Sequence, residues 1–242
     1  MDAAEVWNMS AVSVVNSSSI AAAEVEAVLA AVNKQVSDHF EPPWSIRAWC
    51  SLVENDIAVP GDSVIYVTDE ADVPGALGRH DLYSSGMPCG FVFTRLSDQL
   101  GDGWSVTFSH EVLELIADPE INLLCKGPHP RQRFRKVNHW REMCDAVQAR
   151  TYEIDGVKVS DFVLPAYFTE QNEPHKPTSY MEFAGLAPRI ESFGIAPGGY
   201  VGFEDPLTGQ TTTVQADAES ARRAALKQPF ERGRRAWRRL AR

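Results

Sequence analysis

The segment SHEVLELIADP, residues 109–119, restricts the fold most, because it places four ionisable side chains among strongly apolar ones. The spacing of apolar residues predicts a helix from Trp104 to Ala117, and Asp118-Pro119 ends it because a residue before proline is pushed out of the helical conformation. Its apolar side chains cover most of the circumference, so little of this helix is free to face water. The ionisable side chains therefore either form a solvated stripe or converge on a positive partner such as a metal ion.

Two of these side chains have the spacing of metal ligands. Positions i and i+4 of a helix lie one above the other, so His110 and Glu114 project from the same face. In H-E-x-x-H metallopeptidases the first and last residues bind zinc, and the glutamate between them activates a water. Here Glu114 replaces the second histidine, and its carboxylate binds zinc at about the same distance as an imidazole. Glu111 is then the predicted general base.

A third ligand is needed for a catalytic zinc site, and two residues are candidates. Glu142, in NHWREMCDAV, is favoured because a following segment brings it to the ion from another side. Asp118 is the alternative, although it lies farther along the same helix. Asp145 is predicted to accept the free N–H of His110 and to fix its tautomer.

The composition indicates a single globular domain. The chain has 242 residues, of which 44% are hydrophobic and 10% aromatic, enough to bury a sizeable core. We expect one domain over residues 1–218, with lobes at about 1–118 and 119–218. No apolar run approaches the ~18 residues that span a bilayer, and no basic segment precedes the first apolar residues. The four cysteines form no C-x-x-C pair, so we expect reduced thiols and a cytoplasmic or virion-associated location.

Charge divides the chain into an acidic body and a basic tail. The net charge is −10, yet residues 219–242 carry nine Lys/Arg against two acids, which leaves −17 for residues 1–218. An acidic body argues against nucleic acid as the main partner. The tail is either a docking arm for an unknown anionic partner or a segment that lies on the protein's own acidic surface.

The predicted elements indicate an α+β fold. Strands are expected at 11–16, 44–53, 62–69 and 89–94, a helix at 20–38, and hairpins at 151–168 and 199–214. Asp155-Gly156 supplies the turn of the first hairpin. Residues 70–88 are expected to form a long loop, and residues 120–141 to be irregular.

The segment VTFSHEVLELIADPEINL resembles the metal-binding helix of a group of poorly characterised bacterial and phage proteins with a zincin-like pattern, S-H-E-[VL]-L-E-x-x-x-D-P. It is more distantly similar to plant Exordium-like, phosphate-induced proteins, in which an H-E-x-x-E helix precedes an E-x-x-D segment. The likeness covers roughly residues 12–214 and includes the blocks GALGRHD, GMPCGFVFT, YEIDGVKVSDFVLPAYF, SYMEFAG and PGGYVGFEDPLTG.

This resemblance implies a zincin-like fold with a small mixed sheet, an active-site helix and a strand- and loop-rich C-terminal lobe. It implies His110, Glu114 and Glu142 as ligands and Glu111 as the base. His80, in GRHD, matches a histidine of the family block, where it either stabilises an oxyanion or ties a loop down. A peptide would pair with the sheet-edge strand before the helix, which we expect at 89–94.

The resulting hypothesis is a zinc peptidase. Two carboxylates and one histidine cancel the charge of a divalent ion, so a bound water is less acidified than at a three-histidine site. Carboxylate-rich ligation also admits Mn²⁺. The alternative is a non-catalytic zincin-like structural or binding protein of a phage or secretion-type assembly, in which the metal serves stability.

Overall fold

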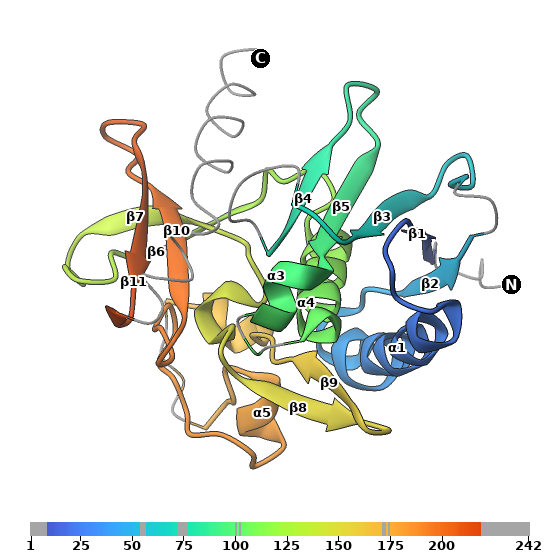
Figure 1. Cartoon of the computed structure of the whole chain (residues 1–242). Coiled ribbons are helices and arrows are strands. Elements are labelled where there is room, and N and C mark those ends of the chain that lie inside the picture. The colour runs from blue at the N-terminus through green and yellow to red at the C-terminus, as the bar shows by residue number, and fades with distance from the viewer. Residues whose placement is uncertain are drawn as a thin grey trace, which may run out of the picture.

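The computed structural model describes residues 9–53, 57–71, 77–99, 101, 103–170, 173 and 175–218, with only the backbone of residue 99. Its elements confirm the α+β class (Figure 1). The basic tail at 219–242 lies outside the described residues. The helical elements are α1 (Ala22–Lys34), a π-helix (Gln35–Phe40), α2 (Glu41–Trp44), α3 (Thr94–Gln99), α4 (Trp104–Ala117), α5 (Tyr180–Phe183) and two 3-10 turns (Asp145–Val147 and Pro165–Phe168).

A five-stranded mixed sheet forms the first half of the fold. Its strands are β1 (Ser10–Asn16), β2 (Ala48–Leu52), β3 (Ser63–Thr68), β4 (Gly78–Leu82) and β5 (Pro88–Phe93), in the order β2-β1-β3-β5-β4. The first four in that order are parallel, and β4 runs antiparallel to β5 at the edge. The strand predicted at 89–94 is confirmed as β5, but its predicted place at the sheet edge was wrong. β5 is an interior strand, and β4 occupies the edge within the segment expected to be a loop.

The second half of the chain supplies a hairpin and a four-stranded antiparallel sheet. The hairpin pairs β8 (Thr151–Ile154) with β9 (Val157–Ser160), and the sheet has the order β11-β10-β7-β6. Its strands are β6 (Leu124–Pro128), β7 (Lys136–Trp140), β10 (Tyr200–Glu204) and β11 (Thr211–Gln215). The hairpin predicted at 199–214 is confirmed, and the one predicted at 151–168 is confirmed only over 151–160. The prediction of irregular structure at 120–141 was wrong because β6 and β7 form there.

Helix α4 lies between these two halves. Figure 1 shows α1 and α4 on one side of the five-stranded sheet, with the β8–β9 hairpin on the far side of α4. One hydrophobic core joins residues of the sheet, both helices and the hairpin, among them Val12, Val32, Val92, Phe108 and Val159. Every residue of α4 except Ser105 is buried, so the prediction that the helix has almost no face toward water is confirmed.

Several other predicted features have clear outcomes. The helix expected at 20–38 is α1 followed by the π-helix, and the strand expected at 44–53 begins only at Ala48. Asp155 and Gly156 have the positive φ angles expected of a tight hairpin turn. All four cysteines are free thiols. Within the described ranges, the helices are too short or too polar to cross a membrane.

Two serines fasten α4 to the hairpin, one turn apart. Ser109 Oγ accepts a hydrogen bond from the backbone N–H of Ser160 at 2.7 Å and donates to the Val106 carbonyl at 3.1 Å. Ser105 Oγ donates to the Lys158 carbonyl at 2.9 Å, but this bond is exposed. The buried serine therefore satisfies a backbone amide that water does not reach.

We predict that Ser109→Ala lowers the free energy of unfolding by about 1–3 kcal/mol, because the buried N–H of Ser160 loses its acceptor. Ser105→Ala is the matched control, and its effect should stay within about 0.5 kcal/mol because its bond faces solvent. Urea denaturation of both variants measures the difference. Equal losses in the two variants would contradict this account of how the helix is fixed.

Candidate metal centre

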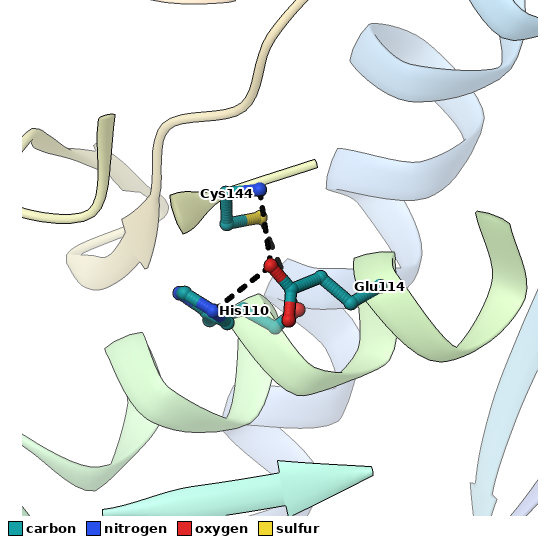
Figure 2. Close-up of side chains that lie close together, drawn as sticks. All are labelled: His110, Glu114 and Cys144. Atoms are coloured by element: carbon teal, nitrogen blue, oxygen red, sulfur yellow. Dashed lines mark hydrogen bonds and ion pairs between the residues drawn. The ribbon is translucent and has the colours of Figure 1, made fainter. Parts of the chain in front are cut away.

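The first pair of predicted ligands meets on the buried face of α4. His110 Nε2 lies 3.1 Å from Glu114 Oε1, one helical turn apart. The two residues are only 5% and 3% exposed. Figure 2 shows their side chains turned toward one another, beneath the segment that carries Cys144. The arrangement follows from the i,i+4 spacing, since both side chains leave the helix in nearly the same direction.

The segment after β7 covers the side chains of His110 and Glu114. The backbone N–H of Cys144 donates to Glu114 Oε1 at 3.2 Å, and its thiol lies 3.9 Å from the His110 carbonyl (Figure 2). Burial, with the carboxylates of Glu114 and Asp145 nearby, raises the pKa of the Cys144 thiol well above its usual value. The backbone N–H of Cys144 thus holds Glu114 in place, and its thiol lies in the same buried group as His110 and Glu114.

Asp145 brings a second carboxylate close to His110. Its Oδ1 lies 3.3 Å from His110 Nε2, the nitrogen that also faces Glu114. In a tetrahedral zinc site with bonds of about 2.0–2.1 Å, two donors lie roughly 3.3 Å apart. His110 Nε2 therefore faces two carboxylate oxygens, one from Glu114 and one from Asp145.

His80 lies on the other side of Glu114, where strand β4 passes α4. Its Nδ1 is 3.4 Å from Glu111 Oε2 and 3.6 Å from Glu114 Oε2. Its Nε2 is 3.6 Å from Glu142 Oε2. The imidazole thus sits among three carboxylates, and its side chain is 4% exposed.

Strand β4 comes this close to α4 because residue 78 is a glycine. A Cβ on Gly78 would lie 2.6 Å from Glu111 Oε1 and 2.8 Å from Thr107 Cγ2, both closer than real Cβ contacts. Any larger residue would push the strand away from the helix or displace the Glu111 carboxylate. Sequence reasoning did not single out Gly78, although the motif GALGRHD contains the signal.

The structure brings together every predicted site residue except Asp118. Glu142, predicted as the third ligand, lies beside His80. Asp145, predicted to contact the opposite nitrogen of His110, approaches the nitrogen that faces Glu114. Asp145 therefore contacts His110 through a different ring nitrogen from the one expected, and Glu142 contacts His80.

Asp118 lies at the end of the helix, and its carboxylate binds the backbone of the turn that follows. Its Oδ1 accepts from the backbone N–H of Asn122 at 3.1 Å, and its Oδ2 accepts from that of Leu123 at 2.9 Å. Both oxygens thus hold the turn that follows α4 by accepting from its backbone N–H groups. Among the candidate residues, Asp118 is the one whose carboxylate is engaged by backbone amides of its own turn.

The dominant electrostatic feature is a group of buried carboxylates. Glu111, Glu114, Asp145 and Glu142 are 2%, 3%, 3% and 8% exposed. Removing a carboxylate from water costs several kcal/mol unless a cation or hydrogen bonds compensate. The ion pairs described for this group come from His80 and His110. Even with both imidazoles protonated the six side chains would carry −2.

In comparisons with known proteins, the chain matches no family model, no curated protein and no solved structure.

We predict that Asp118→Ala lowers the free energy of unfolding by about 1–3 kcal/mol, because two backbone amides lose their acceptor. The variant should bind divalent metal as the wild type does, since Asp118 holds the turn and not an ion. Glu120→Ala, at an exposed position of the same turn, is the control and should change stability by no more than about 0.5 kcal/mol. Loss of metal from Asp118→Ala with stability unchanged would instead identify Asp118 as a ligand.

Proposed function

We propose that this protein is a metal-dependent hydrolase that cleaves peptide bonds, with zinc as the leading metal. The observation that carries the proposal is the pair of His110 Nε2 and Glu114 Oε1, 3.1 Å apart, in a buried group with Cys144 whose ligand atoms all lie within 4.8 Å of one another. Imidazole and carboxylate are common ligands of zinc and also suit Mn²⁺. A divalent ion bound there supplies Lewis-acid activation of water and of a substrate carbonyl.

Asp145 is the proposed third ligand, in place of Glu142, because its Oδ1 lies 3.3 Å from His110 Nε2. Glu142 instead lies beside His80, with its Oε2 3.6 Å from His80 Nε2. His110, Glu114 and Asp145 together carry −2, which neutralises a divalent ion.

Glu111 is the proposed general base. It follows His110 directly in α4, and its Oε1 packs against Gly78 of the edge strand while its Oε2 faces His80 Nδ1 at 3.4 Å. In this role Glu111 accepts a proton from the attacking water and returns it to the leaving amine. His80 keeps the carboxylate oriented, and it is also close enough to the centre to donate to a developing oxyanion.

The arrangement of the sheet supports the interpretation that the fold is zincin-like. In that architecture an edge strand precedes the metal-binding helix, and here β4 is at the edge and antiparallel to its neighbour. An extended peptide is therefore proposed to pair with β4, residues 78–82, and not with β5. Such pairing would bring the peptide backbone past His80 and close to Glu111.

A structural metal site is the second candidate function, and burial favours it. Every proposed donor is at most 8% exposed, and structural zinc sites are closed whereas catalytic ones keep a position open for water and substrate. In this alternative the ion offsets the charge of the buried carboxylates and stabilises the fold without catalysis.

We predict that Glu111→Gln separates the two functions. The variant, purified as the full chain without chelator, should retain at least one equivalent of metal by elemental analysis. Its cleavage of fluorescein-labelled casein should fall by about 10²–10⁴-fold, because the amide cannot accept the proton. Glu120→Gln, on the exposed turn after α4, is the matched control and should keep full activity.

Two other results would argue against the proposed peptidase activity. Equal behaviour of wild type and Glu111→Gln toward casein and toward a fluorogenic peptide library, with metal present in both, would favour the structural site. Absence of metal from the wild type, together with unchanged stability of His110→Ala, would contradict both functions.

A further inference from the structure

The two oxygens of the Glu114 carboxylate face two different imidazoles. Oε1 lies 3.1 Å from His110 Nε2, and Oε2 lies 3.6 Å from His80 Nδ1. One carboxylate thus belongs to two groups of potential ligands. The first contains His110 with Glu114 and Cys144, and the second contains His80, Glu111 and Glu114, the ligand atoms of each group lying within 4.8 Å of one another.

We propose that the protein holds a second divalent cation, bound by His80 Nδ1, Glu111 Oε2 and Glu114 Oε2, with Glu114 bridging the two ions. The inference rests on the proposed function for its first ion and adds a second site to it. The donor separations from His80 Nδ1 are 3.4 and 3.6 Å. They are slightly longer than those around His110 Nε2, so the second site fills after the first.

Charge supports a second ion. Metal-binding histidines are neutral, so both imidazoles contribute no charge once they act as ligands. The four carboxylates of Glu111, Glu114, Glu142 and Asp145, all buried, then carry −4. One divalent ion balances half of that charge, whereas two balance all of it. Two-metal hydrolase sites commonly share a bridging ligand, with the ions roughly 3.5–4 Å apart.

Glu142 contacts a ligand of the second site without being a ligand itself. Its Oε2 lies 3.6 Å from His80 Nε2, so the proton of the imidazole would face this carboxylate when Nδ1 binds the ion. That tautomer, with the proton on Nε2, directs the lone pair of Nδ1 toward Glu111 and Glu114. Occupation of the site also makes Glu111 Oε2 a ligand, so Glu111 acts as the base only while the second site is empty.

The test is the number of zinc ions bound by the full chain. Metal-free protein is titrated with ZnCl₂ by calorimetry, and bound zinc is counted by elemental analysis after desalting. We expect two equivalents in the wild type and one in His80→Asn. His175→Asn removes an exposed histidine and should keep two, which controls for zinc bound at the surface. Circular dichroism checks that each variant is folded.

The outcomes separate this inference from the proposed function. One equivalent in both the wild type and His80→Asn would overturn the second site and leave the first in place. No zinc in His80→Asn would show that His80 serves the first ion, and would also overturn it. No zinc in the wild type would contradict the proposed function itself. If His80→Asn does not fold, Glu111→Gln provides the same count, with one equivalent expected and two contradicting the site.

Discussion

The rest of the structure depends on the burial of charge within α4. Two glutamates and a histidine occupy a helix whose other buried residues include Phe108, Val112 and Leu113. Each buried carboxylate costs several kcal/mol unless something compensates for its lost hydration. The segment after β7 adds two more buried carboxylates, those of Glu142 and Asp145. An accumulation of this kind is typical of a functional site.

The scaffold confines these charges from two directions. The β8–β9 hairpin holds one side of α4 through Ser109, and the edge strand β4 approaches the other side at Gly78. The backbone amide of Cys144 then fixes the Glu114 carboxylate from above. Because regular elements or their immediate ends supply the donors, their positions are determined before any ion binds, which is what a pre-organised metal site requires.

Local patterns in the sequence were enough to predict helix α4. The strands that were missed are paired through contacts between residues far apart in the sequence. Both ends of α4 were predicted correctly, since apolar periodicity and Asp118-Pro119 are local signals. Strand β4 was missed because GRHDL lacks apolar alternation and pairs only through β5. β6 and β7 were missed because LCKGP contains glycine and proline, which are depleted in strands, and KVNHW has no run of apolar residues. The i,i+4 pair of His110 and Glu114 was predictable, whereas the choice between Glu142 and Asp145 depends on how a distant turn folds over α4.

The central claim is that α4 and the segment after β7 hold a divalent ion at one defined point. Diffraction from crystals soaked in ZnCl₂, recorded on both sides of the zinc absorption edge, tests it most directly. The account predicts an anomalous peak about 2.0–2.2 Å from His110 Nε2, Glu114 Oε1 and Asp145 Oδ1. A map with no peak among these three atoms, or with zinc bound only at surface histidines, would contradict it.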